Sequence, residues 1–294
     1  MSSTSTIQTT SVNGVSFVQL KSGETREAIL IENAHSKTMI ALNGAHVMSF
    51  IPKGKPDLLW MSPKSELTAG TPIRGGIPLC LPWFGPGIAE NQPMHGFARV
   101  VDWAVASVKQ TEDGATKIVL VLADSPKSHE VWPVAFASQL EITAGTQLTM
   151  KLSFQNKSNN TQRLEFAFHT YFNIGDTNKV SIEGLEGCHG IDRMNDDSLI
   201  NVEGPLELEG ATTRFFSGIP EHLFLNSPMG QISISGDQKS CMVWNPGEAA
   251  AKVADIGAGA EANFVCVERV DAMDTAITLK PSATYTASMA IGWS

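Results

Sequence analysis

The chain reads Gln147-Leu-Thr-Met-Lys-Leu-Ser-Phe154, in which polar and apolar residues alternate strictly. Alternation with a period of two is typical of a β-strand that has one buried and one exposed face. Residues 284–291 repeat the pattern, and Ile232 and Ile234 belong to a third such run. Turn sequences such as Glu112-Asp113-Gly114 separate the runs and are spaced to join antiparallel strands. The pattern predicts an all-β protein, built as an antiparallel β-sandwich or barrel.

No Pro/Gly/Ser linker, block of charge or internal repeat divides the 294 residues. A chain of this length can bury one large core, so we expect a single domain over residues 15–294. Residues 1–14 are polar and lack the features of a secretory signal, which predicts a flexible N-terminal tail. Residues 124–130 favour a short helical turn. The residues from 85 to 93 are rich in Gly, Pro and Asn and indicate a surface loop.

Composition excludes several classes of function. A net charge of −9 opposes nucleic-acid binding, which depends on clustered Lys and Arg. No apolar run approaches the roughly 20 residues that span a bilayer, so we expect no membrane insertion. The four cysteines lie far apart without Cys-x-x-Cys spacing, which favours free thiols over a zinc site or disulfides. Free thiols favour a cytoplasmic protein. We also expect a monomer that holds no metal or cofactor.

His169 and Glu268 are the residues that best suggest chemistry. His169 follows an aromatic strand-like run and could be a hydrogen-bonded core residue or a proton donor. If alternation holds, Glu268 shares a strand face with Phe264 and Cys266, as an inward carboxylate or as a residue leaving the core. Desolvation raises the pKa of an inward carboxylate towards the range useful for a base. A His and a Glu that face one cavity would form an acid/base couple.

Arg74 and Arg99 are the candidate anion ligands. Each lies beside glycine or small residues that allow a ligand to approach closely. They could simply form surface salt bridges. If they converge on a phosphate, each contributes about 4 kcal/mol of Coulomb energy at an effective dielectric of about 20, enough to hold an anion on an acidic protein.

Several motifs occur together in one order along the chain, and in that order they resemble the hexose-6-phosphate 1-epimerase branch of the aldose 1-epimerase superfamily. The motifs are RGGIPLCLPWFGP from Arg74, HGFAR from His95, HTYFNIGD from His169, WNPG from Trp244 and FVCVE ending at Glu268. The resemblance extends from about residue 40 onward. It implies a galactose-mutarotase-like antiparallel β-sandwich with a sugar site on its concave face.

The resemblance also implies site residues. His169 is similar to the general acid of the family and Glu268 to its general base. His95 and Arg74 match sugar-contacting positions, and Arg99 matches a position implicated in phosphate binding. The usual Thr-Asp-Arg-Val-Tyr-Leu segment appears here as residues 220–225, so that Glu221 would stand in for the substrate-binding Asp.

The function implied is interconversion of the α and β anomers of hexose 6-phosphates, with glucose 6-phosphate as the expected substrate. Glu268 would deprotonate the anomeric hydroxyl while His169 protonates the ring oxygen. Two alternatives stay open. One is a non-catalytic carbohydrate-binding sandwich, and the other is a cupin-like metalloenzyme with His95, His169 and Glu268 as ligands, although the chain lacks a His-x-His pair.

Overall fold

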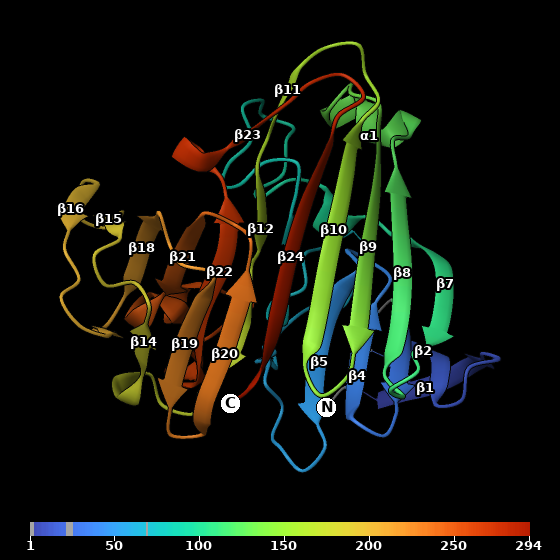
Figure 1. Ribbon diagram of the computed structural model, residues 1–294, viewed down its shortest axis with the longest axis horizontal. Helices are drawn as coiled ribbons and strands as arrows, with labels where there is room; N and C mark the ends of the chain where they lie inside the picture. Colours follow the sequence, from blue (N-terminus) through green and yellow to red (C-terminus); the bar gives the residue numbers. More distant parts are fainter. Residues whose placement is uncertain (1–2, 22–25, 69) are drawn as a thin grey trace.

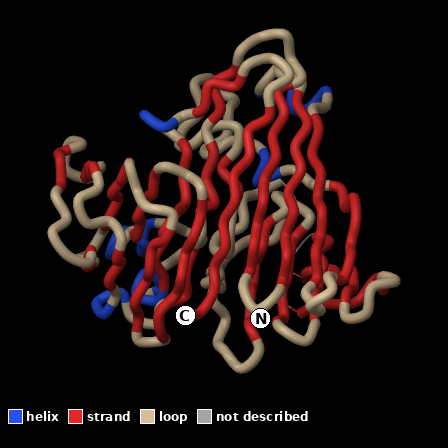
Figure 2. Tube along the Cα trace, in the orientation of Figure 1, coloured by secondary structure: helices blue, strands red, loops and turns tan. Residues whose placement is uncertain are grey.

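The structure of the protein is a computed structural model that describes residues 3–21, 26–68 and 70–294. Strands make up most of it, and the helices are short pieces near the ends and edges of the sheets (Figures 1 and 2). All of the strand pairings in the described part of the chain are antiparallel. The all-β, antiparallel prediction is confirmed.

A five-stranded sheet opens the chain, with its strands in sequence order. Its strands are β1 (Ser3–Thr9), β2 (Val15–Lys21), β3 (Arg26–Glu32), β4 (Ser36–Ala41) and β5 (His46–Pro52). The segment expected to be a flexible tail thus contains β1, which pairs along its length with β2. Three of its seven residues are Thr, which has a high β propensity.

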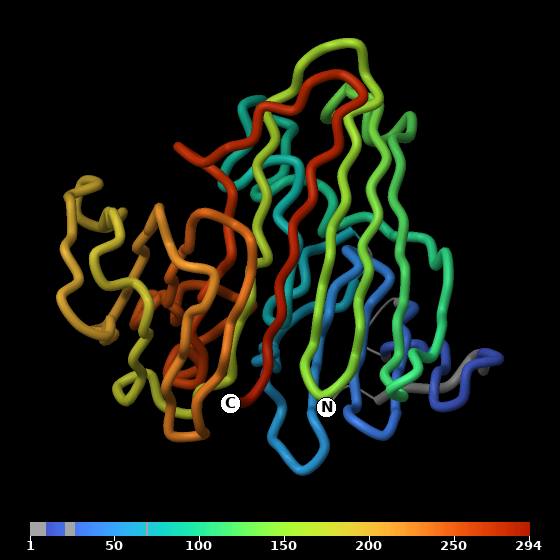
Figure 3. The backbone as a smooth tube through the Cα atoms, viewed as in Figure 1, coloured from blue at the N-terminus to red at the C-terminus, as the bar shows by residue number. Residues whose placement is uncertain are grey.

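A nine-stranded sheet forms one wall of the sandwich, in the order β17-β14-β19-β20-β24-β10-β9-β8-β7. Its strands are β7 (Ala104–Gln110), β8 (Thr116–Ala123), β9 (Phe136–Ala144), β10 (Leu148–Asn156), β14 (Ser181–Glu183), β17 (Leu206–Glu207), β19 (His222–Ser227), β20 (Gly230–Gly236) and β24 (Thr284–Trp293). Figure 3 shows the last strand, in red, running beside the yellow-green β10, with which it pairs.

An eight-stranded sheet forms the other wall, in the order β16-β15-β18-β21-β22-β12-β6, with β13 also paired to β22. Its strands are β6 (Leu79–Cys80), β12 (Phe166–Phe168), β13 (Tyr171–Asn173), β15 (His189–Asp192), β16 (Ser198–Ile200), β18 (Thr212–Ser217), β21 (Ser240–Asn245) and β22 (Phe264–Asp271). A separate pair joins β11 (Gln162–Leu164) to β23 (Ile277–Leu279).

The helices are short connections. Helix α1 (Pro126–Val131) confirms the expected helical turn, and its capping box links Ser125 and Ser128. The 3-10 helices are η1 (Ala98–Val100), η2 (Thr177–Lys179), η3 (Gly247–Lys252), η4 (Ala260–Asn263) and η5 (Met273–Thr275). Among the described residues, no helix has the length and apolar character needed to cross a membrane.

The core lies between the two large sheets. Leu148, Met150 and Leu152 of β10 are almost fully buried, as their alternation predicts, and they share one apolar cluster with Val265 and Val267 of β22. Burying each such side chain stabilises the fold by about 1.5–3 kcal/mol. Since one face of β22 is committed to this core, its other face is left for the residues described next.

Candidate active site

Glu268 lies within β22, a strand buried along its whole length. Val265 and Val267 point into the core between the sheets, whereas Phe264 and Cys266 belong to a different cluster on the opposite face. Glu268 follows the same alternation, and its side chain lies close to the Cys266 thiol. The prediction that these three residues share a face is confirmed. Glu268 is therefore an inward carboxyl group, only 1% exposed.

His169 stands across from Glu268 because of strand register. The strands β12 and β13 both pair with β22, and a short break between them contains His169. Phe168, the last residue of β12, pairs with Arg269, so the next residue comes opposite Glu268. The backbone N–H of His169 donates to the carbonyl of Pro78 at 3.0 Å, which fixes the break. His169 Nδ1 lies 3.4 Å from Glu268 Oε1.

Burial favours the uncharged form of both groups. It raises the pKa of Glu268 well above its ordinary value, and the positive charge of Arg99 opposes this only in part. It lowers the pKa of His169 well below its ordinary value, and the neighbouring His95, Arg99 and Arg74 lower it further. Within the described part of the chain, His169 Nδ1 and Glu268 Oε2 have no hydrogen-bond partner. The contact is close enough for an ion pair but is not aligned as a hydrogen bond, which leaves the lone pairs of both groups free to act.

His95 presents a neutral imidazole edge to the couple. The backbone N–H of Gly85 donates to His95 Nδ1 at 3.0 Å, so the proton of the neutral ring is on Nε2. Burial, followed by the charges of Arg99 and Arg74, lowers the pKa of His95 to about 3. Its ring meets that of His169 edge-on, with centroids 5.6 Å apart. His95 is thus a permanent hydrogen-bond donor beside the couple.

Arg74 is held by two partners. Its Nε donates to Asp255 Oδ2 at 3.0 Å, and its Nη1 donates to the hydroxyl of Tyr171 at 2.8 Å. The Tyr171 ring stacks on His169 with centroids 4.9 Å apart and an angle of 2° between planes. A chain of contacts therefore runs from Asp255 to the imidazole and fixes the ring plane of His169.

Arg99 has donor capacity to spare. It lies in η1, its Nη2 donates to the carbonyl of Met94 at 2.7 Å, and its Nε is buried without a partner among the described residues. Its charge acts on both His95 and Glu268, so it lies near the couple. Gly96 makes this turn possible, because it has a φ of +76° and a Cβ there would overlap the carbonyl of Leu81.

Comparison with known proteins places the chain in a family. The family model described as aldose 1-epimerase matches residues 27–292. The chain belongs to the aldose 1-epimerase family. It is therefore an isomerase that interconverts the anomers of an aldose.

Relatives of this epimerase bear similar names. A protein of Escherichia coli (strain K12) named "Putative glucose-6-phosphate 1-epimerase" is 32% identical over 254 residues, which cover 85% of this chain and 84% of that protein. A protein of Cenchrus ciliaris with the same name is 28% identical over 272 residues, covering 86% of this chain and 80% of that protein.

Solved structures confirm the fold of the epimerase. A crystal structure described as a "putative mutarotase" from Salmonella typhimurium superposes with a TM-score of 0.88 at 24% identity, covering 99% of this chain and 97% of that one. A galactose mutarotase-like protein from Lactobacillus casei has a TM-score of 0.69 at 19% identity, with 91% and 100% covered. The galactose-mutarotase-like fold is confirmed.

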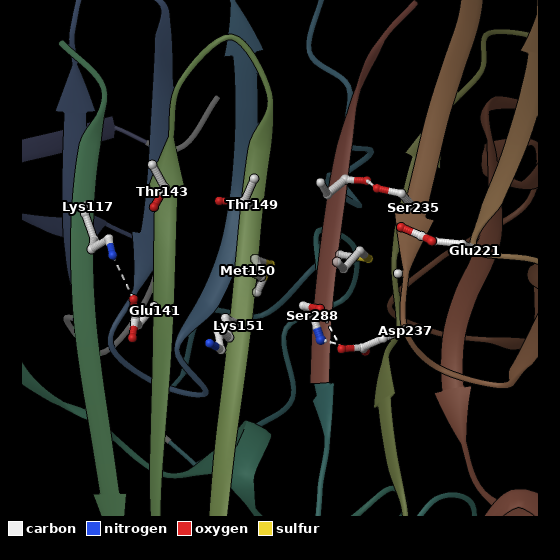
Figure 4. Close-up of a pocket in the computed structure, with 13 residues that line it drawn as sticks. Lys117, Glu141, Thr143, Thr149, Met150, Lys151, Glu221, Ser235, Asp237 and Ser288 are labelled. Carbon is white, nitrogen blue, oxygen red and sulfur yellow. Dashed lines mark hydrogen bonds and ion pairs between the residues drawn. The ribbon is translucent and has the colours of Figure 1, made fainter. Parts of the chain in front are cut away.

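The structure does not bring Glu221 to the site of the epimerase. Its side chain is 75% exposed and lines a groove of about 450 Å³ on the outer face of the nine-stranded sheet, with Ser235 and Asp237 (Figure 4). The physical reason is the strand that follows. Glu221 precedes β19, which belongs to this sheet, whereas Glu268 lies in β22 of the other sheet, where its side chain is buried on the face opposite to Val265 and Val267. A motif alone does not say which sheet a segment joins.

Sequence reasoning missed two residues that contact the predicted site residues. Tyr171 could have been found, since it follows His169 in the same aromatic run. No sequence pattern points to Asp255, because it is an isolated carboxylate in a connecting segment. Trp244, noted for its motif, has its ring edge-on to His169 with centroids 6.2 Å apart. One group of metal-ligating atoms also occurs here among the described residues, formed by His169, Cys266 and Glu268.

Proposed function

We propose that this epimerase interconverts the α and β anomers of hexose 6-phosphates, with glucose 6-phosphate as the preferred substrate. The observation that carries the proposal is the 3.4 Å contact between His169 and Glu268 in a buried site. The names of the curated relatives support the choice of a phosphorylated sugar.

The reaction needs one base and one acid. Glu268 as carboxylate removes the proton of the anomeric hydroxyl, and the oxygen lone pair forms the C1=O double bond. The electrons of the bond between C1 and the ring oxygen pass to that oxygen, which takes a proton from His169. The open aldehyde rotates about the C1–C2 bond and recloses on its other face, with both proton transfers reversed. Acid and base steps of this kind each contribute roughly 10²–10⁴-fold.

The couple carries one exchangeable proton throughout the reaction. Ring opening turns carboxylate and imidazolium into carboxylic acid and neutral imidazole, which are the forms that burial favours at Glu268 and His169. A proton shift across the contact restores the charged forms that open a ring. Because Nδ1 of His169 faces Glu268, Nε2 is the nitrogen that serves the substrate.

The other side chains are assigned by the donors they offer. Arg74 is occupied by Asp255 and Tyr171, so it is positioned to reach sugar hydroxyls with its remaining N–H groups. His95 offers its Nε2–H to a sugar oxygen. Arg99 keeps an unpartnered buried Nε, and we assign it to the phosphate. A local guanidinium is needed because the net charge of −9 repels an anion.

Anomer-exchange NMR on glucose, galactose and their 6-phosphates tests the proposal. Each rate is measured for the wild type and Arg99→Ala, with the enzyme-free rate subtracted. Arg163→Ala is the matched control, because Arg163 is exposed and pairs with Glu165 away from the couple. We expect exchange of the phosphorylated sugars to fall with Arg99→Ala alone, while exchange of the free sugars is unchanged. Equal loss for free and phosphorylated sugars would contradict the assignment of Arg99.

Two further features accompany the proposal. We place the enzyme in the cytosol, because its four cysteines are free and a reducing compartment keeps thiols in that state. We also expect one domain and a monomer, which sedimentation of the purified protein would check.

A further inference from the structure

Three potential metal ligands meet at the catalytic couple. His169, Cys266 and Glu268 each offer one ligand atom, and the three atoms all lie within 4.8 Å of one another. Cys266 and Glu268 are two residues apart on β22 and so share a face, while His169 comes from across the strand pair. The three side chains are buried, with exposures of 0%, 1% and 7% for Cys266, Glu268 and His169.

We propose that this triad binds a thiophilic divalent cation, Zn²⁺ or Cd²⁺, and that the bound cation inhibits the epimerase. Nitrogen, sulfur and oxygen donors form the set that Zn²⁺ prefers, with a fourth position open to water. His169 and Glu268 each carry a buried polar atom, Nδ1 and Oε2, that has no hydrogen-bond partner in the described part of the protein. Such atoms are costly to bury alone, and a cation would satisfy both.

Charge balance decides which cation fits. The positive charges of Arg74 and Arg99 act on this region, so an added cation must be neutralised within the triad. The thiolate of Cys266 and the carboxylate of Glu268 supply two negative charges, which match one Zn²⁺. Binding releases the thiol proton, and that of Glu268 if protonated, to solvent; no ligand changes its oxidation state. A thiolate is a poor ligand for Mg²⁺, which selects oxygen.

Inhibition follows from the atoms that the cation occupies. The lone pair of Glu268 that accepts the anomeric proton, and the imidazole that shuttles the second proton, would both be coordinated. The inhibitory part of the inference therefore rests on the proposed function, whereas binding does not. The triad also differs from the cupin-like site considered from the sequence, which had His95 in the place of Cys266. The Nδ1 atom of His95 already accepts a hydrogen bond from the backbone N–H of Gly85.

The experiment uses chelator-treated full-length protein. Zn²⁺ is titrated while heat of binding and glucose 6-phosphate anomer exchange are followed, and Cd²⁺ binding is read from its thiolate charge-transfer absorption. The variants are Cys266→Ser and, as matched control, Cys241→Ser, a buried thiol of the same sheet that faces the core. Each variant is compared with its own metal-free rate. Cys266→Ala is included in case the serine variant does not fold.

We expect stoichiometric Zn²⁺ to suppress exchange in the wild type and in Cys241→Ser, and a chelator to restore it. Cys266→Ser should weaken both binding and inhibition by at least about 10–100-fold and abolish the Cd²⁺ absorption band. Mg²⁺ should have no effect. Equal Zn²⁺ affinity of Cys266→Ser and the wild type, or no Cd²⁺ band in the wild type, would overturn the inference. Binding without inhibition would overturn its inhibitory part. A wild type that shows the band but no exchange would instead refute the proposed function and leave the cation site standing.

Discussion

Replacing Glu268 with Gln should separate the activity of the epimerase from its stability. The amide keeps the size of the side chain but cannot accept the anomeric proton. Losing the base costs roughly 10²–10⁴ in rate, which corresponds to about 2.7–5.4 kcal/mol of transition-state stabilisation. Sugar phosphate binding should change little, because the assigned ligands Arg74, His95 and Arg99 remain in place.

The same change should also stabilise the fold relative to the wild type, by an amount that grows as the pH rises. Burial raises the folded-state pKa of Glu268 above its ordinary value of 4.5, so the folded protein retains a proton that the unfolded chain has lost. The favourable contribution of this group is complete below pH 4.5 and is lost as the pH rises towards the folded-state pKa. The slope is at most about 1.4 kcal/mol per pH unit for one proton. Glu268→Gln has no such loss, so its advantage over the wild type should grow from pH 4.5 upward.

Urea unfolding at a series of pH values, combined with exchange NMR, measures both effects. Glu141→Gln is the matched control, because Glu141 pairs with Lys117 on the outer sheet face and a hydrogen bond from Lys117 lowers its pKa. The pKa shift of Glu141 is opposite in direction to that of Glu268. The control variant should therefore be less stable than the wild type above pH 4.5, by at most about 1 kcal/mol for a partly exposed pair. Exchange by Glu268→Gln within tenfold of the wild type would refute the base assignment. A stability difference between Glu268→Gln and the wild type that does not shift in favour of the variant above pH 4.5 would refute the account of burial.

Three further predictions concern residues around the couple. Tyr171→Phe removes an acceptor of Arg74 but keeps the ring stacked on His169, so we expect KM for exchange to rise about tenfold with a smaller change in kcat. In urea titrations below pH 6.5, the free energy of unfolding of His169→Asn should depend less on pH than that of the wild type. The lowered pKa of the imidazole gives the wild type a stabilising contribution that is present above pH 6.5 and is lost as the pH falls. Arg269→Met should cost about 3–5 kcal/mol of unfolding free energy in urea, since it removes the hydrogen bonds that Arg269 donates to the carbonyls of Pro220, Gly236 and Gln238, while KM of the folded enzyme is unchanged.

Local pattern was enough to predict the strands and the direction of their side chains. The alternation at Leu148, Met150 and Leu152 placed these residues in the core, and the same rule placed Glu268 beside Cys266. A period of two follows from the geometry of a single strand, so no knowledge of distant segments is needed.

The meeting of His169 with Glu268 could not be predicted from pattern, because it depends on pairing between segments far apart in the chain. A shift of the register by one residue would send one of the two side chains to the other face of the sheet. The same limit explains Glu221, whose sheet is decided by how β19 pairs, and Asp255, which reaches Arg74 from a distant connection. The family resemblance supplied the partnership of His169 and Glu268, which strand periodicity alone does not contain.

Burial of the couple is best understood through the reversibility of its reaction. In water, a Glu and a His prefer the charged pair by about 2 pKa units, or roughly 3 kcal/mol. A mutarotase must pass through both the charged and the uncharged forms in every cycle, so a strong preference for either would slow one direction of proton transfer. Burial raises the pKa of Glu268 and lowers that of His169, so it acts against the preference for charge. Arg99 lowers the pKa of both groups, so it favours the carboxylate of Glu268 but disfavours the imidazolium of His169. Burial is therefore the feature that brings the charged and uncharged forms of the couple closer in free energy, as a reaction that runs in both directions requires.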